Sequence, residues 1–186
     1  MSEKLLLPPQ EGLYPTPVVL VSCRDKTGKR ANIITIAWCG VICSAPPLLS
    51  ISIRPSRLSH KIISEAGDFV INIPTSEIIK KTDLCGIRSG KETDKFKACA
   101  FTEVPSSKIS SPMIRECPFN IECKVKDVLK LGSHDMFIAE VVAIHADEAI
   151  TTNGRVDFKK ARPFVYNHGE YWDLNKRIGS YGYSAK

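Results

Sequence analysis

The sequence predicts a mainly β protein of the α+β class, a closed or partly closed antiparallel barrel with short helices inserted between its strands. Three observations lead to this prediction. Short runs of β-branched and apolar residues recur along the chain of 186 residues. They do not alternate regularly with helical segments, as they would in a doubly wound parallel sheet. Two long segments in the second half alternate apolar and polar residues, as antiparallel strands with one buried face do.

Four strands are predicted in the first half, because each run is rich in β-branched and apolar residues. Asp25 and Gly28 favour a turn between the first two, which makes them a hairpin. The sequence SAPP breaks the chain before the third. The four predicted strands are residues 17–23 (PVVLVSC), 31–38 (ANIITIAW), 48–54 (LLSISIR) and 68–74 (DFVINIP).

Short helices are predicted between and after these strands. The first covers residues 60–67 (HKIISEAG), where Ser59 is expected to cap its start and Gly67 to end it. Residues 76–85 are predicted to form the second helix. Residues 86–101 are predicted to be a loop that leads into a short third helix.

In the second half, residues 106–112 (SSKISSP) read as a polar connector whose serines need no functional explanation. Long strands are predicted over residues 119–132 and 134–147, and residues 162–167 and 171–174 add a strand and an edge. The apolar side chains expected on the buried face are Ile121, Cys123, Val125 and Val128 in the first long strand, and Phe137, Ala139 and Val141 in the second.

Length and composition indicate one globular domain, residues 1–186, with 43% hydrophobic and 25% charged residues. No apolar run approaches the roughly 20 residues that span a bilayer. The start, MSEKLLLPPQ, has too short an apolar stretch for a signal peptide. We therefore expect a cytoplasmic protein that does not bind membranes.

The net charge of +6 suits three kinds of partner: nucleic acid, an anionic membrane or a phosphorylated small molecule. The 26 Lys and Arg residues are scattered, whereas a nucleic-acid surface usually carries a wider basic stripe. We expect no nucleic-acid binding.

Seven cysteines are present, and no two form a C-x-x-C pair. The odd number and the spacing favour neither a disulfide framework nor a zinc site, so no metal is expected. Free thiols packed as small hydrophobic side chains are the expected state. A redox role for Cys39 or Cys85 stays open.

The densest cluster of cations follows the third predicted strand, in SIRPSRLSHK at residues 52–61. A strand ends and a helix begins here, and helix N-termini bind phosphate through free amides and the helix dipole. The alternative is an exposed loop with solvated charges. The cluster consists of Arg54, Arg57, His60 and Lys61, interleaved with Ser52, Ser56 and Ser59.

Polar residues also interrupt the second predicted strand, at Asn32 and Thr35, and Trp38 ends it. Buried polar groups need partners. Thr35 bonding locally and Trp38 lying in the core would account for this pattern. Together with a phosphate site, however, the pattern suits a pocket for a planar ring with a phosphate tail.

Several blocks of sequence, in this order between about residues 14 and 182, resemble the flavin reductase-like, FMN-binding split-barrel family, and most closely its flavoredoxin-type branch. The resemblance implies a Greek-key split β-barrel with inserted helices. It also implies a homodimer with FMN in a groove at or near the subunit interface. The blocks are PTPVVLVSCRDKTGKRANIITIAW, SAPPLLSISIRPSRLSHKII, GDFVINIP, CGIRSGKETDKF, ECPFNIECKV, GSHDMFIAEV and YWDLNKRIGSYG.

The resemblance also implies roles for individual residues. The run from Thr35 to Trp38 would lie along the isoalloxazine ring, with Asn32 at its start and backbone amides facing the N5 and O4 edge. The residues implied for the ring are Thr35, Ile36, Ala37 and Trp38; those for the ribityl chain are Ser52, Ile53 and Arg54; and those for the phosphate are Arg57, Ser59, His60 and Lys61.

Later blocks imply further contacts. Asp94, Lys95 and Phe96 would form a structural anchor beside the cofactor. His134 would lie towards the flavin face, where a nicotinamide stacks, or would bond to a loop at a strand end. Three aromatic residues would cover the ring or the dimer interface, namely Tyr166, Tyr171 and Trp172. The alternative is that they are ordinary core or interface aromatics.

The activity implied is that of an NAD(P)H:flavin oxidoreductase, in which hydride passes to flavin N5 and electrons pass on to a small-molecule or protein acceptor. No side chain is expected to be catalytic, since the flavin carries the chemistry. NAD(P)H would bind transiently, because no G-x-G-x-x-G motif is present. The sequence TIAWCG favours the flavoredoxin or ferric-reductase side over a monooxygenase partner. The alternative function is an FMN electron carrier reduced by a protein partner.

Overall fold

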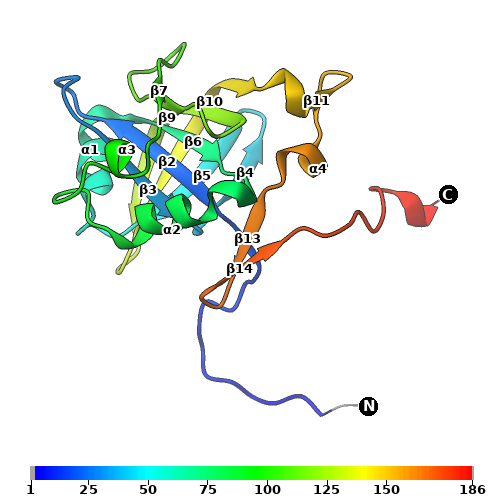
Figure 1. Cartoon of the computed structure of the whole chain (residues 1–186). Helices are drawn as coiled ribbons and strands as arrows, with labels where there is room; N and C mark the ends of the chain where they lie inside the picture. Colours follow the sequence, from blue (N-terminus) through cyan, green and yellow to red (C-terminus); the bar gives the residue numbers. More distant parts are fainter. Residues whose placement is uncertain (1–2, 186) are drawn as a thin grey trace.

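The computed structural model describes residues 3–185 and confirms a mainly β fold. Its main feature is one antiparallel sheet of seven strands in the order β3-β2-β6-β9-β10-β5-β4 (Figure 1). The strands are β2 (Val19–Arg24), β3 (Ala31–Ile36), β4 (Cys39–Ser44), β5 (Pro47–Ile53), β6 (Asp68–Ile73), β9 (Phe119–Lys130) and β10 (Asp135–Ala146).

The two end strands of this sheet, β3 and β4, are consecutive in the chain. Only residues 37 and 38 separate them, so the sheet must curl until its ends approach each other. At this link the Ser52 amide donates to the Trp38 carbonyl at 2.8 Å, which extends the pairing of β4 with β5 by one residue and brings the end of β3 next to β5. The curl makes the sheet a barrel.

Apolar side chains fill the barrel. Burying each large apolar side chain contributes roughly 1.5–3 kcal/mol, so this core is the main source of stability. As predicted, Cys123, Phe137 and Ala139 face inward. The other fully buried core members include Val21, Ile51, Ile53, Ile63 and Phe69.

A second core lies outside the barrel, where α2 and α3 pack against β3. Leu20 and Ile33 of the sheet meet Cys85, Phe96 and Cys99 there. The helices are α1 (Leu58–Ala66), the 3-10 helix η1 (Ser76–Ile78), α2 (Ile79–Ile87), α3 (Lys95–Ala98) and α4 (Phe158–Ala161).

The first helix ends as predicted, since Gly67 adopts a left-handed φ of 79° and its amide bonds back to Ile63. Its start differs from the prediction. Arg57 is the N-cap residue, and the buried Ser59 lies within the helix. The helix begins earlier because Leu58 packs against the barrel core.

The prediction missed β4, for which the sequence CGVICS carries little signal. This strand is at the end of the sheet, and the side chain of Val41 is 76% exposed. An irregularity between Val41 and Cys43 breaks the register with β5. An exposed, bulged edge strand lacks the regular alternation that identifies buried strands.

Smaller strands complete the fold. The hairpin of β13 and β14 pairs with β1 and lies apart from the main sheet, and the two ends of the chain lead away from the barrel (Figure 1). These strands are β1 (Thr16–Pro17), β7 (Glu103–Val104), β8 (Met113–Ile114), β11 (Thr151–Thr152), β12 (Arg155–Val156), β13 (Phe164–Asn167) and β14 (Glu170–Asp173); 3-10 helices η2 (Glu148–Ile150) and η3 (Tyr183–Ala185) accompany them.

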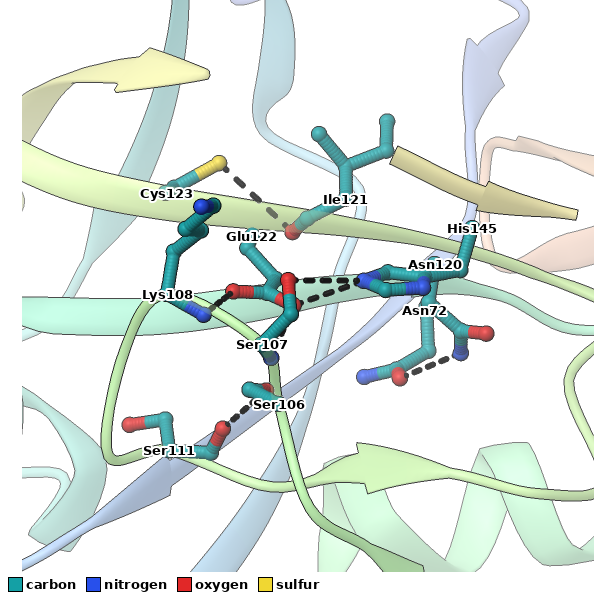
Figure 2. Close-up of polar contacts among 10 residues, drawn as sticks. All are labelled: Asn72, Ser106, Ser107, Lys108, Ser111, Asn120, Ile121, Glu122, Cys123 and His145. Carbon is teal, nitrogen blue, oxygen red and sulfur yellow. Dashed lines mark hydrogen bonds and ion pairs between the residues drawn. The ribbon is translucent and has the colours of Figure 1, made fainter. Parts of the chain in front are cut away.

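The polar connector is bound to the sheet by two carboxylates. Glu122 in β9 is fully buried and accepts hydrogen bonds from the amides of Ser107 and Lys108, both at 2.7 Å (Figure 2). Asp68 in β6 accepts from the amide of Ser111 at 3.1 Å. The prediction of a single buried face for β9 therefore fails at Glu122, because the connector covers the other face.

Within residues 3–185, no helix is long and apolar enough to cross a membrane. The same residues contain no group of three or more His, Cys, Asp or Glu side chains placed to hold a metal ion. All seven cysteines lie in this part of the chain as free thiols.

Candidate functional site

Two adjoining pockets lie along β3, each with a volume of about 420 Å³. They share Ile34, Arg54 and Arg57, so they form one continuous groove. The first, here called the basic pocket, is lined by Asn32, Ser56, Leu58, Ser59, Arg88, Ser89, Gly90 and Lys95 besides these three. The second, here called the aromatic pocket, is lined among others by Thr35, Ile36, Ala37, Trp38, Ser52, Ile53, Asp83, Gly86, His134, Tyr166 and Tyr171.

Lys95 is the most unusual residue of the basic pocket, because it is a cation with only 4% of its surface exposed. Its ammonium donates to the carbonyl of Ile33 at 2.8 Å and to that of Cys85 at 2.6 Å. An ammonium has three donors, so one is left over. Burial lowers the pKa of Lys95, and the charge of Arg57 adds to this effect.

No carboxylate neutralises this ammonium: within residues 3–185, Lys95 forms no ion pair. Three further cations, Arg54, Arg57 and Arg88, line the same pocket. Buried charges are normally paired, because leaving water without a partner costs several kcal/mol. The basic pocket is therefore suited to an anion that can accept several hydrogen bonds.

The floor of the basic pocket is polar and tightly packed. The side-chain amide of Asn32 donates to the Ser59 hydroxyl at 2.8 Å, which gives this buried side chain a partner. The loop between α2 and α3 crosses directly over Asn32 at Gly90. A Cβ at this position would overlap the Asn32 amide, so a larger residue there needs Asn32 or the loop to move.

In the aromatic pocket, the indole of Trp38 lies nearly parallel to the imidazole of His134, with 6.4 Å between ring centroids. Tyr166 from the β13–β14 hairpin lies 6.0 Å from Trp38 at an angle of 54°. Burial, together with the positive charge of Arg54, lowers the pKa of His134. The imidazole is therefore neutral at neutral pH, and the pocket offers flat, uncharged walls.

Helix α2 forms the opposite side of this pocket. The hydroxyl of Thr35 donates to the carbonyl of Thr82, and Gly86 lies against the Thr35 side chain. Tyr171 donates to Asp83 at 2.9 Å, which joins the hairpin to α2. Burial and this carboxylate raise the pKa of Tyr171.

The structure brings most of the predicted site residues into this groove. Those in the basic pocket are Asn32, Arg54, Arg57 and Ser59, and those in the aromatic pocket are Thr35, Ile36, Ala37, Trp38, Ser52, Ile53, Arg54, Arg57, His134 and Tyr171.

Two predicted site residues, His60 and Lys61, lie outside both pockets. His60 contacts Asp135 at 2.8 Å. The side chain of Lys61 is 73% exposed and lies 3.9 Å from Glu65. Both belong to α1, whose early start places them beyond the pocket lining. Trp172 also lies outside, on the exposed face of β14, where its indole bonds to Glu170.

The sequence reasoning missed the contributions of Arg88, Ser89 and Gly90 to the basic pocket and of Asp83 to the aromatic pocket. The segment RSGK, residues 88–91, combines cations with a serine as the first cation cluster does. This similarity could have identified it as a second part of an anion site. Lys95, predicted as a structural anchor, ties β3 to α2 and also faces the pocket.

A serine, a histidine and a carboxylate also meet away from the groove, but their geometry does not suit nucleophilic catalysis (Figure 2). Nε2 of His145 lies 2.6 Å from Glu122 and 3.5 Å from the hydroxyl of Ser107. In a catalytic triad the two ring nitrogens contact different partners. Here one nitrogen contacts both, so the cluster serves to hold the connector.

Three comparisons relate the chain to known proteins. The family model "Flavin reductase like domain" matches residues 12–175, which include all residues of both pockets. Flavoredoxin of Desulfovibrio vulgaris (Miyazaki F) is 31% identical with a TM-score of 0.92, over 99% of this chain and 100% of that chain. Flavoredoxin from Methanosarcina acetivorans is 30% identical with a TM-score of 0.90, over 100% of both chains. An uncharacterised protein of Pyrococcus abyssi is 33% identical over 79% of this chain and 83% of that protein.

Proposed function

We propose that the groove along β3 binds FMN. The premise is that this chain belongs to the flavin reductase-like family and has its split-barrel fold. The isoalloxazine ring would occupy the aromatic pocket, and the phosphate the basic pocket. The protein would act as an NAD(P)H-dependent flavin oxidoreductase. We further propose that it forms a homodimer and works in the cytoplasm.

The observation that carries this proposal is the uncompensated ammonium of Lys95. Together with Arg54, Arg57 and Arg88 it places four cations around one pocket, which is more positive charge than a ligand with a single carboxylate would neutralise. A phosphate dianion accepts several charge-assisted hydrogen bonds, which suits three guanidinium groups and a lysine. The residues present therefore fit the phosphate end of FMN.

The aromatic pocket fits the isoalloxazine end of FMN. Strand β3 is at the end of the sheet and pairs only with β2, so alternate backbone amides of Thr35–Ala37 have no strand partner. These amides would hold the polar edge of the ring and stabilise negative charge there. Trp38 and the hairpin would restrict the access of water to it.

When FMN is bound, it supplies the two-electron chemistry of the reaction. This chain's own residues would bind, orient and shield. His134, which stays neutral, would present a flat face on which a nicotinamide can lie without repulsion between like charges. Ser52 and Ile53 would line the ribityl chain between the two pockets.

The decisive test is an absorption spectrum of the purified protein, supplemented with FMN where needed, before and after anaerobic addition of NADH and then NADPH. We expect flavin bands that bleach with at least one nucleotide. A protein that takes up no FMN would contradict the flavin site, and an FMN-loaded protein that neither nucleotide bleaches would contradict the reductase activity.

The similarity to two flavoredoxins over the whole chain supports a second candidate, an FMN electron carrier reduced by a protein partner. The same spectrum separates the two. A carrier keeps its flavin bands in the presence of both nucleotides and loses them with dithionite.

A further inference from the structure

Two free thiols lie in contact in the second core, where α2 and α3 pack against β3. The sulfur atoms of Cys85 and Cys99 are 3.6 Å apart. A disulfide bond holds its sulfur atoms about 2.05 Å apart, so a movement of roughly 1.5 Å would join them. Neither thiol lines the groove, and neither has a part in the proposed flavin chemistry. The redox role that the sequence leaves open for Cys85 therefore has a partner in the structure.

The segment between these two cysteines carries much of the groove wall. Its groove residues are Gly86, Ile87, Arg88, Ser89, Gly90 and Lys95. The ammonium of Lys95 also donates to the carbonyl of Cys85 at 2.6 Å, so one cysteine of the pair holds the buried cation through its backbone. A bond between the two sulfur atoms would close residues 85–99 into a ring that contains all these groove residues.

Cys99 is the thiol that an oxidant reaches first. It keeps 4% of its surface exposed, whereas Cys85 is fully buried. It is the C-cap residue of α3, which has only four residues, and its thiol donates to the Lys81 carbonyl at 3.7 Å. Such a short element opens locally at a small free-energy cost. Burial raises the pKa of Cys85, and the neighbouring Cys99 adds to this effect, which keeps the second thiol protonated until its partner has reacted.

We propose that Cys85 and Cys99 form a reversible disulfide, with hydrogen peroxide as the oxidant, and that this bond fixes the groove segment between them. The sulfur of Cys99 attacks peroxide, the O–O bond breaks and water leaves, which gives a sulfenic acid. The sulfur of Cys85 then attacks this sulfur, the S–O bond breaks and a second water leaves. The two cysteines lose two electrons, their protons end in water, and a dithiol reductant reverses the reaction.

The first experiment maps disulfides in the flavin-free protein after treatment with hydrogen peroxide and again after dithiothreitol. Alkylation of free thiols, digestion and mass spectrometry should find a bond between Cys85 and Cys99 that dithiothreitol removes. Closing a loop of about 15 residues restricts the unfolded chain, so the urea midpoint of the oxidised protein should rise by roughly 1 M. A pair that stays reduced, or a bond from Cys85 to Cys117 of the same core, would overturn the proposal.

Two variants connect the bond with the change in stability, each compared before and after peroxide so that altered packing cancels. Cys99→Ala removes the partner of Cys85, and the rise in the urea midpoint should vanish. Cys117→Ala is the matched control, because it removes another buried thiol of the same core and should keep the rise. A rise that survives Cys99→Ala, or that disappears in Cys117→Ala, would contradict the assignment of the pair.

The effect on the groove is measured with FMN, and this part alone rests on the proposed flavin site. A closed ring leaves the empty segment less freedom to lose on binding, so we expect the dissociation constant of FMN to be about threefold lower for the oxidised protein. If the bond forms and both forms bind FMN equally, the bond does not fix the groove and this part of the proposal is wrong. If neither form binds flavin, the proposed function fails, whereas the mapped disulfide stands.

Discussion

The side chain of Asn32 fills the space where a side chain at position 90 would begin: a Cβ on Gly90 would overlap Oδ1 of Asn32. This contact joins β3 to the loop that runs from Arg88 to α3, which begins at Lys95, and so it sets the shape of the basic pocket. The shape of the basic pocket therefore depends on the absence of a side chain at position 90 as well as on its charged residues.

The first prediction follows from this contact. Gly90→Ala forces either the loop or Asn32 to move, at a cost of roughly 1–3 kcal/mol. We expect a lower urea midpoint and weaker FMN binding. Gly40→Ala is the matched control, because an added Cβ there meets nothing within 4 Å. Equal effects of the two substitutions would contradict the role of the contact.

The second prediction concerns the phosphate. Arg57→Ala removes a charge-assisted hydrogen bond worth roughly 1.5–3 kcal/mol, which is about tenfold or more in affinity. FMN should be weakened by this amount and riboflavin much less, since only FMN carries the dianion. Lys61→Ala serves as the control, because that side chain points to solvent beside Glu65. Titration of each variant with both flavins measures the difference, and equal losses for the two flavins would show that Arg57 does not contact the phosphate.

The third prediction concerns Lys95. Lys95→Met keeps the length of the side chain but leaves the carbonyls of Ile33 and Cys85 without their donor, at roughly 1–3 kcal/mol each. We expect a loss of stability in the flavin-free protein and, in addition, weaker FMN binding. Lys97→Met, at an exposed position two residues away, should change neither. An unchanged urea midpoint for Lys95→Met would mean that the ammonium does not tie β3 to α2.

The fourth prediction is a pH dependence at Glu122. Burial alone would raise its pKa, but the hydrogen bonds from Ser107, His145 and Lys108 together lower it below the ordinary value of 4.5. A carboxyl with a lowered pKa stabilises the fold above the ordinary pKa and loses this contribution as the pH falls through the lowered value. Glu122→Gln should therefore cost at least about 2 kcal/mol at pH 7.

Urea unfolding of Glu122→Gln and the unmodified protein at pH 7, 5 and 4 checks this. The difference in unfolding free energy should be largest at pH 7 and should narrow below pH 5. A difference that stays constant down to pH 4 would show that the ionised carboxylate is not what the connector needs. Glu116→Gln, whose exposed carboxylate accepts from Thr102, controls for the charge change.

Much of the barrel could be predicted because its strands are buried. The runs at β2, β3, β5 and β6 are apolar enough to identify without a partner, and Gly67 ends α1 because only a residue that tolerates positive φ suits that position. β4 could not be predicted in this way, since it is exposed and irregular and is a strand only because it pairs with β5.

In the candidate site, too, some residues could be predicted from the sequence and others could not. Arg54 and Arg57 are predictable because they directly follow a buried strand. Lys95 joins them only through tertiary structure, since its ammonium must reach across to Ile33 in β3. His60 and Lys61 lie outside the two pockets, on a helix that begins at Leu58, and the spacing of charges in the sequence does not reveal where a helix begins.

The two-residue link between β3 and β4 has a consequence for the dynamics of the protein. Trp38 is both a wall of the aromatic pocket and the acceptor of the hydrogen bond from the Ser52 amide that ends the pairing of β4 with β5 at this link. Fraying of this end of the β4–β5 pairing would move a wall of the pocket, so a bound ligand should oppose it. A ligand that binds only while this end is paired stabilises the pairing by RT ln(1 + [L]/Kd), so hydrogen exchange at the Ser52 amide should report whether the pocket is occupied.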